Sequence, residues 1–289
     1  MPNHNLLYYG DNLEILRQYI KDESIDLVYL DPPFNSNANY NVLFAEHSGS
    51  KSSAQIQAFE DTWTWGEDSD QAYREIVERG GRVSEAMQAF RQLLGQSNMM
   101  AYLAMMAPRL VELHRVIKTT GSLYLHCDPT ASHYLKILLD SIFSPINFQN
   151  EIIWKRTGAH NDPGRYGANI DIILFYTKGN KWTWNQIFIP HDEDYVARFS
   201  HKDADGRLWS DYDLSAKGLS GGGYEYEYKG VKSLWRCPLD TMQRLDVEGK
   251  LHFTSKGGIR IKRYLDENKG TVLQCLWDDI SPINSQAQE

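Results

Sequence analysis

Four consecutive residues, Asp31-Pro32-Pro33-Phe34, combine a carboxylate, two prolines and an aromatic ring at one point of the chain. This set suits a reaction on an aryl amine such as the exocyclic amine of adenine, whose lone pair is delocalised into the ring. The Asp31 carboxylate and the Pro32 carbonyl could accept the two amine hydrogens, favouring a pyramidal nitrogen with an outward lone pair. The Phe34 ring could stack on a base taken out of a duplex. The alternative is a turn that ends a strand, with Asp31 capping a neighbouring group.

The residues before this tetrapeptide predict the element that positions it. Residues 25–30 form an apolar run interrupted only by Asp26, as in a buried parallel strand. Pro32 and Pro33 lack amide donors and fix two φ angles, so the strand cannot continue past Asp31. In open parallel sheets ligands bind beyond the carboxyl ends of the strands, where this tip would lie.

A second strand is expected at the start of the chain. Leu6 to Tyr9 read as a short strand, followed by Gly10-Asp11-Asn12 and a helix-like segment at residues 13–20. Asp11 would then lie at the carboxyl end of that strand, at the same edge of the sheet as Asp31.

Seven segments, taken in order, resemble the β class of amino-methylating DNA methyltransferases and cover nearly the whole chain. They are GDNLEIL at 10–16, IDLVYLDPPFN at 25–35, GSLYLHCD at 121–128, NEIIWKR at 150–156, DIILFYTK at 171–178, KRYLDENKG at 262–270 and WDDISPIN at 277–284. The resemblance implies transfer of a methyl group from S-adenosyl-L-methionine to the exocyclic amine of adenine in double-stranded DNA. Methylation of cytosine N4 fits the same two-acceptor geometry. Aspartate at position 31 favours adenine only because the resemblance to the family implies it.

The resemblance also implies roles for particular residues and partners. The catalytic residues would be Asp31, Pro32, Pro33 and Phe34; the cofactor contacts Asp11 and Asp31; and the contacts to the target site Tyr40 and Asn41. A restriction endonuclease is a further expected partner, as in restriction-modification systems.

One element of the family pattern is missing from the sequence. β-class enzymes carry a glycine-rich turn of the FxGxG kind after a strand, where the backbone approaches the amino-acid end of the cofactor. Here Gly221-Gly222-Gly223 follows no apolar strand, and Gly257-Gly258 lies in a basic segment. The family order places the motif after WDDISPIN, and its strand between the Asp31 strand and the region of residues 6–9. We therefore expect an incomplete sheet and a complementing polypeptide; a truncated product, half of a split enzyme, or a non-catalytic DNA-binding remnant or subunit are the alternatives.

The expected fold class is α/β, a doubly wound Rossmann-like methyltransferase sheet, incomplete, with a target-recognition insert. Expected helices are 69–78, 84–94, 98–118 and a helix capped by Thr130 and running to about 142; expected strands are 122–126, 151–154 and 170–176, the last two as an antiparallel edge. Residues 1–181 would form the partial catalytic domain, with a lid at 35–66 that orders with DNA. Residues 182–275 would form the target-recognition region, and 276–289 a tail leading to the missing motif.

Charge and composition limit the remaining classes. A net charge of −8 argues against a general nucleic-acid binder. The segment 256–263 nevertheless carries four cations and no acid, and Arg260, Lys262 and Arg263 lie where the family's DNA-facing segment falls. They would contact phosphates, or else form a solvated face. The three cysteines have no metal-ligand spacing and indicate free thiols. No apolar run approaches the ~20 residues of a membrane span and no signal peptide is evident, so we expect a cytoplasmic protein.

Overall fold

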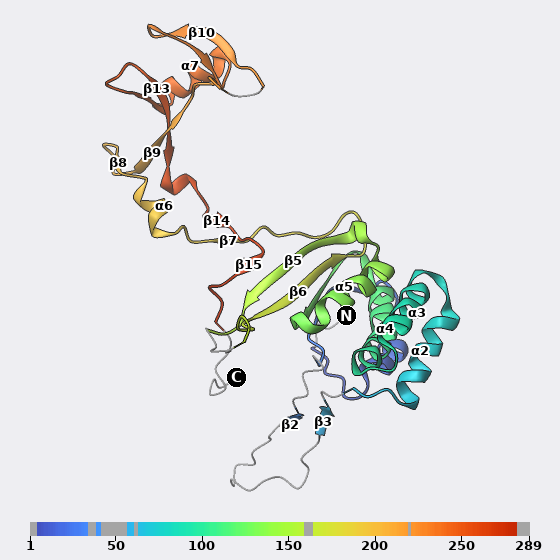
Figure 1. Ribbon diagram of the computed structural model, residues 1–289. Coiled ribbons are helices and arrows are strands. Elements are labelled where there is room, and N and C mark those ends of the chain that lie inside the picture. The colour runs from blue at the N-terminus through green and yellow to red at the C-terminus, as the bar shows by residue number, and fades with distance from the viewer. Residues whose placement is uncertain are drawn as a thin grey trace. The chain divides into compact units, whose positions relative to one another are not determined.

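The computed structural model describes residues 5–33, 39–41, 57–60, 63–158, 164–218 and 221–281, and for 39–41 and 57–60 the backbone alone. The chain divides into two compact units (Figure 1). Unit 1 comprises Met1–Asn185 with Gln274–Glu289, and unit 2 comprises Gln186–Leu273.

Unit 1 contains a sheet and a group of helices. Its elements are α1 (Asn12–Tyr19), β1 (Ile25–Leu30), β2 (Asn39–Asn41), β3 (Gln57–Glu60), α2 (Glu67–Arg79), α3 (Gly81–Leu94), α4 (Asn98–Val116), β4 (Ile117–Cys127), α5 (Pro129–Phe143), the 3-10 turn η1 (Pro145–Asn147), β5 (Phe148–Lys155), β6 (Ile170–Thr177) and β15 (Leu276–Trp277). The strands β2 and β3 pair with each other and are antiparallel.

The main sheet has the strand order β1-β4-β6-β5-β15. β4 runs parallel to β1, β6 runs antiparallel to both β4 and β5, and β15 runs parallel to β5. The expected antiparallel pairing of β5 with β6 is confirmed, but their position at the edge is wrong. β6 lies inside the sheet because its run of apolar residues is buried on both faces, and β15 forms that edge instead.

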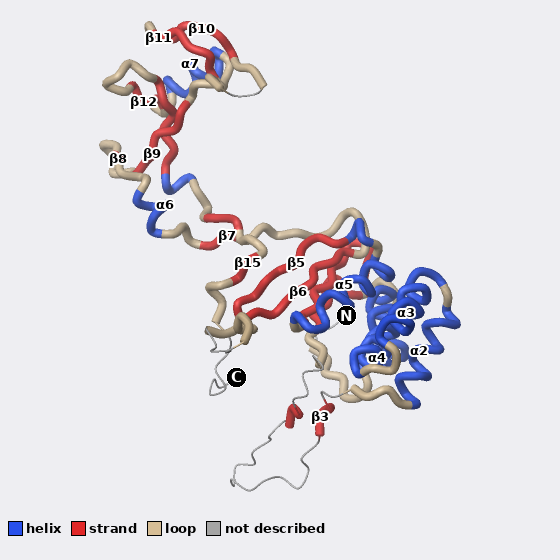
Figure 2. Tube along the Cα trace, viewed as in Figure 1, coloured by secondary structure: helices blue, strands red, loops and turns tan. Residues whose placement is uncertain are grey.

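The core of unit 1 lies between the sheet and its helices. Figure 2 shows α2, α3, α4 and α5 gathered beside the strands of the sheet. The helix expected at 98–118 is confirmed as α4, and its Leu103, Met106, Leu110 and Leu113 are buried in the core cluster. A three- and four-residue spacing places these side chains on one face of a helix, where burial of each contributes about 1.5–3 kcal/mol.

Helix starts follow local side-chain caps. The Asp128 side chain accepts a hydrogen bond from Ala131 N at 3.1 Å and begins α5, with Pro129 at its first position. The expected cap at Thr130 is therefore wrong. Proline is well tolerated at the first position of a helix, so the helix begins at Pro129 and Thr130 is its second residue. Ser97 caps α4 in the same way through Met100 N.

The outer edge of β1 is exposed. Residues 6–9 form no strand, so the strand expected there is wrong. Among the described residues β1 pairs with β4 alone, and α1 has no buried residue. The parallel strand expected at residues 25–30 is confirmed, but its expected burial is wrong: β1 has no buried residue, and Leu27 and Tyr29 are 59% and 57% exposed. Without a strand beside β1, the LLYY segment has no partner to pair with.

Unit 2 is built from short strands and two helices. Its elements are β7 (Phe188–Ile189), α6 (Glu193–Ala197), β8 (His201–Lys202), β9 (Leu208–Asp213), β10 (Tyr224–Tyr228), β11 (Val231–Trp235), α7 (Leu239–Val247), β12 (Leu251–Phe253), β13 (Ile259–Tyr264), the 3-10 turn η2 (Leu265–Glu267) and β14 (Thr271–Val272). The sheet β12-β13-β9-β8, the hairpin β10-β11 and the ribbon β7-β14 are all antiparallel. Trp235 is 2% exposed at the centre of a small core with Met242, and its Nε1 donates to Tyr226 O at 2.9 Å.

Over the described part of the chain, no helix has the length and apolarity needed to cross a membrane. Those same residues contain no cluster of histidine, cysteine and acidic side chains that could hold a metal ion.

Candidate active site

The tip that follows β1 presents one carboxylate to solvent. The Asp31 side chain is 58% exposed, whereas Pro32 is buried and Pro33 is half-buried. The chain therefore fixes the backbone of this tip and leaves the Asp31 carboxylate accessible. Phe34 lies outside the described residues.

The neighbouring strands bring a histidine and a second aspartate to this tip. β4 runs parallel beside β1, so His126 near the end of β4 lies next to Asp31 at the end of β1. β6 runs antiparallel beside β4, which places Asp171 near its start on the other side of His126. His126 Nδ1 is 3.0 Å from Asp31 Oδ1, and His126 Nε2 is 3.1 Å from Asp171 Oδ2.

Burial and these two carboxylates act on His126 in opposite directions. Burial of the ring favours its neutral form and lowers its pKa, but the hydrogen bonds and charges of Asp171 and Asp31 outweigh burial and raise the pKa of His126 to about 9. Asp171 is 1% exposed, and Arg156 Nη1 lies 3.4 Å from its Oδ2. Acidic and basic side chains alternate along the row Asp31–His126–Asp171–Arg156.

Two further groups near this row hold their protons. Burial, followed by the charges of Asp31 and Asp171, raises the pKa of the Tyr29 hydroxyl. Burial, with nearby carboxylates, raises the pKa of the Cys127 thiol, so this cysteine is not an activated nucleophile. That agrees with free thiols, the interpretation drawn from the cysteine spacing.

Asp11 is held at the start of α1. Its Oδ1 accepts a hydrogen bond from Leu13 N at 2.7 Å, and Arg109 Nη2 on α4 donates to both of its oxygens, at 2.9 Å and 2.7 Å. The Asp11 side chain is 46% exposed. A carboxylate has about four acceptor positions, so one position on Oδ2 remains for a ligand.

The remaining predicted site residues lie elsewhere. Tyr40 and Asn41 belong to β2, of which the structure describes the backbone alone. Most of the expected lid, 35–66, lies outside the described residues, and so do 282–289 of the expected tail.

Three predicted DNA contacts lie on β13 of unit 2. Arg260 Nε is 2.8 Å from Asp211 Oδ2, and Lys262 Nζ is 2.9 Å and 3.1 Å from the two oxygens of Asp203. The Arg263 guanidinium lies 4.5 Å from the centre of the Tyr212 ring. Two of the three cations are thus compensated inside the unit, and within the described residues Arg263 alone of the three forms no ion pair.

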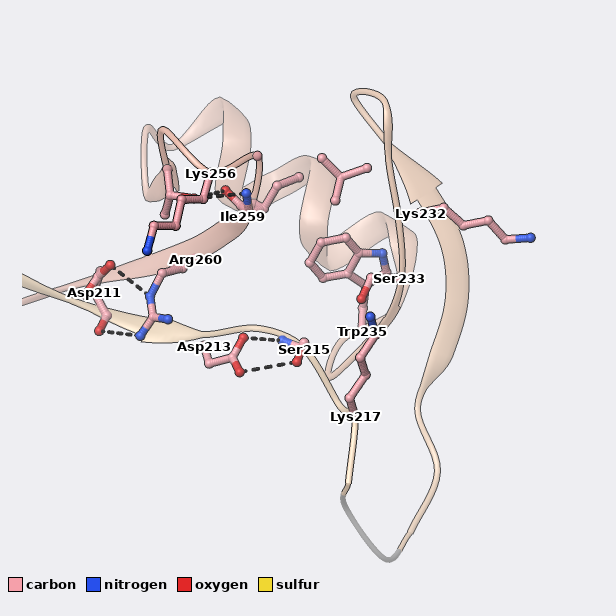
Figure 3. A pocket seen from close by; sticks show the side chains of 14 residues that line it. Asp211, Asp213, Ser215, Lys217, Lys232, Ser233, Trp235, Lys256, Ile259 and Arg260 are labelled. Atoms are coloured by element: carbon pink, nitrogen blue, oxygen red, sulfur yellow. Dashed lines mark hydrogen bonds and ion pairs between the residues drawn. The ribbon is translucent and has the colours of Figure 1, made fainter.

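A pocket of about 460 Å³ lies beside this strand. Its lining combines cations with acids, and Figure 3 shows Arg260 turned toward Asp211 and Asp213 toward Ser215. The Lys232 ammonium points away from these pairs in the same view.

Sequence reasoning missed three residues of the site. Asp171 is the one acid in the apolar run of β6, and a buried acid in a strand needs a partner, which is a signal that could have been followed. Arg109 and Arg156 gave no signal, since arginines on a helix and after a strand are common. His126 is the last residue of the strand expected at 122–126, and that position is a signal for the same edge of the sheet as Asp31.

Unit 1 is an α/β domain, with a mixed sheet, helices beside it and the Asp-Pro-Pro tip after β1. The chain belongs to the DNA methylase family N6_N4_Mtase, whose model matches residues 25–287.

The chain is also similar to several named proteins. The Mod subunit of the type III restriction-modification enzyme StyLTI from Salmonella typhimurium (strain LT2) is 26% identical over 294 residues, covering 96% of this chain and 41% of the relative. The type II methyltransferase M.EcaI from Enterobacter cloacae is 24% identical over 292 residues, covering 99% and 55%. The chain thus spans about half the length of these curated relatives. Among solved structures, the TTHA0409 DNA modification methylase from Thermus thermophilus aligns with a TM-score of 0.36 at 12% identity, covering 95% of this chain and 66% of that one.

Proposed function

We propose that this chain carries the catalytic and recognition parts of a site-specific DNA methyltransferase that methylates the exocyclic amine of adenine. The observation that carries the proposal is the exposed Asp31 carboxylate on a proline-fixed tip at the carboxyl end of β1, in a chain of the DNA methylase family. One relative is named as a type II methyltransferase and another as the Mod subunit of a type III restriction-modification enzyme, and these names support a methyltransferase.

In this proposal Asp31 and the Pro32 carbonyl each accept one hydrogen of the target amine. The nitrogen becomes more pyramidal and its lone pair points away from the two acceptors. S-adenosyl-L-methionine supplies the methyl group when bound. Phe34 stacks on the extruded base, and burial of Pro32 keeps the two acceptors at a fixed separation.

The residues present could hold the adenosine end of the cofactor but not its amino-acid end. Asp11, oriented by Arg109, retains one acceptor position for the adenosine end. The amino-acid end needs a close backbone approach, which glycine after a strand provides, and the sequence has no FxGxG motif. We propose that a strand bearing such a turn pairs with the exposed edge of β1, from a complementing polypeptide or another part of the full protein. The exposed Leu27 and Tyr29 beside that edge support this pairing.

The finer assignments follow from the same proposal. Residues 182–275 would recognise the target sequence in double-stranded DNA, with Tyr40 and Asn41 contacting the target site. A restriction endonuclease subunit is the proposed partner, since the StyLTI relative is named as a Mod subunit of such an enzyme. Methylation of the cytosine amine is the second candidate, because cytosine offers two amine hydrogens to the same acceptors.

Methyl transfer to DNA tests the function directly. The chain, alone and with a polypeptide carrying the missing motif, is incubated with unmethylated DNA and cofactor labelled in the methyl group. The DNA is then digested to nucleosides. We expect label in N6-methyl-2′-deoxyadenosine; label in N4-methyl-2′-deoxycytidine would shift the proposal to cytosine. If neither nucleoside is labelled when cofactor and DNA are both bound, the catalytic assignment fails and the chain is a non-catalytic DNA-binding subunit.

Replacing Arg260, Lys262 and Arg263 together with alanine is expected to weaken DNA binding and to flatten its dependence on salt. Each lost phosphate contact reduces the slope of log K on log salt by about 0.9. Arg263→Ala alone should account for most of the change, because Arg260 and Lys262 already pair with acids. Fluorescence anisotropy at several salt concentrations measures the slope.

Arg244→Ala is the matched control for the single substitution Arg263→Ala. Arg244 is an exposed cation on α7 of the same unit, so its loss changes net charge equally without altering β13. An unchanged slope in the triple variant would show that the basic strand is solvated and does not contact phosphates.

A further inference from the structure

His126 joins the end of β1 to the interior of the sheet. On one side its Nδ1 lies 3.0 Å from the exposed carboxylate of Asp31; on the other its Nε2 lies 3.1 Å from the buried carboxylate of Asp171. The His126 side chain is itself 8% exposed. An accessible acid is thus connected to a buried one through a single ring.

The geometry around this ring favours its protonated form. Both nitrogens lie at hydrogen-bond distance from an aspartate side-chain oxygen, and a carboxylate oxygen can only accept. Both nitrogens donate only when the imidazole carries two protons, which agrees with the raised pKa of His126. A charge-assisted hydrogen bond of this kind is shorter and about twice as strong as a neutral one.

The groups around the ring are consistent with a cation. Asp31 approaches it from the end of β1, Asp171 from β6, and the Trp154 ring on β5 lies with its centroid 5.7 Å away. Arg156 follows β5 and contacts Asp171 from the far side. Tyr29 on β1 keeps its proton. The two acids and the two cations cancel, so the row needs no further counter-charge.

We propose that His126, anchored by Asp171, is a positioning residue that holds the Asp31 carboxylate in the orientation needed for the target amine. The ring engages Oδ1 of Asp31, which leaves Oδ2 to accept the hydrogen of the amine. Without this anchor an exposed aspartate would rotate among several rotamers. The proposal rests on the proposed methyl transfer and assigns to it two residues that act through Asp31.

The anchor depends on pH in a defined direction. The pKa of His126 is raised to about 9, so the ring stays charged through neutral pH and loses its proton as pH rises through that value. Positioning is complete below about pH 6.5, the ordinary pKa of histidine, and is lost at alkaline pH. The turnover rate should therefore fall above about pH 9.

Titration of the ring by NMR tests the anchor without any assay of activity. Residues 1–289 are labelled at the histidine ring nitrogens, and the resonance of His126 is identified by its absence in His126→Gln. We expect a titration near pH 9, and a decrease in the pKa of at least about one unit in Asp31→Asn and in Asp171→Asn. A ring that titrates near the ordinary value of about 6.5, or that ignores both substitutions, would overturn the proposal.

Kinetics in the active preparation test the effect on the reaction. His126→Gln and Asp171→Asn should each lower kcat by about tenfold to a hundredfold with little change in KM for DNA, since misplacement of a reacting group by about 1 Å can cost a hundredfold. Each variant should also lose the alkaline decline near pH 9. His133→Gln, an exposed histidine on α5, is the matched control and should keep the wild-type profile.

The two proposals can fail separately. If Asp31→Ala keeps normal turnover, the proposed function fails, and the NMR titration still decides whether His126 bridges the two acids. If Asp31→Ala is inactive but His126→Gln and Asp171→Asn, shown to be folded by near-ultraviolet circular dichroism, retain the kcat and the pH profile of wild type, the function stands and the positioning role is overturned.

Discussion

Asp31→Ala is expected to lower methyl transfer by at least about a hundredfold while DNA affinity stays largely unchanged. The loss is expected because the carboxylate acts on the amine as charge develops in the transition state, and removing one such preorganised group costs about 10²–10³ in kcat. Binding persists because affinity for DNA comes mainly from phosphate contacts. Incorporation of labelled methyl groups gives the rate, and anisotropy gives the affinity.

Asp26→Ala provides a matched control on the same strand. Asp26 lies five positions before Asp31, is 77% exposed and pairs with Lys118 at the surface. Exposed ion pairs of this kind contribute about 0–1 kcal/mol, so this variant should keep full activity. Near-normal turnover in Asp31→Ala, with Asp26→Ala also active, would remove Asp31 from the catalytic site.

Residues 1–289 alone are expected to bind S-adenosyl-L-methionine at least about a hundredfold more weakly than the same residues with a strand and glycine turn added. Asp11 can hold the adenosine end through the acceptor that Arg109 leaves open. The amino-acid end has no close backbone approach in this sequence. Fixing both reactants is what allows orientation to lower a barrier by about 7–11 kcal/mol, so weak binding should also abolish turnover.

Calorimetry with the cofactor measures this difference, and thermal unfolding gives an independent reading. A strand that covers the exposed edge of β1 should raise the melting temperature, because whatever binds the folded form alone stabilises it. A complement with its turn glycines replaced by valine should still raise the melting temperature but not restore cofactor binding. Roughly micromolar binding by 1–289 alone would contradict the prediction and would mean that other residues of this chain form the pocket.

Sequence reasoning succeeded where one segment determines its own structure. The apolar run of β1 ends at two prolines, and the stripe on α4 repeats at helical spacing, so each could be recognised without its neighbours. Sequence reasoning failed where the structure of a segment depends on a neighbouring strand. Residues 6–9 have the composition of a strand, but a strand requires a partner, and β1 leaves its outer edge exposed.

The candidate site shows the same division. The tetrapeptide beginning at Asp31 is local and was recognised from its residue types. The link from His126 to Asp171 spans 45 residues and depends on the register of β4 against β6, which a single sequence does not reveal. The charge of His126 could not be predicted either, because it arises from two acids brought together by three strands.

The short ribbon of β7 with β14 has a consequence for how this protein can evolve. Unit 2 begins at Gln186 and ends at Leu273, and just inside these limits Ile189 pairs with Thr271 and Phe188 with Val272. The two ends of the insert are thus tied together by its own backbone, and domains whose termini lie close are the ones that tolerate insertion and exchange. Recombination between related genes could replace the whole of unit 2. If unit 2 recognises the target sequence as proposed, a lineage would then acquire a new target in one event, while the residues of unit 1 stay under separate selection.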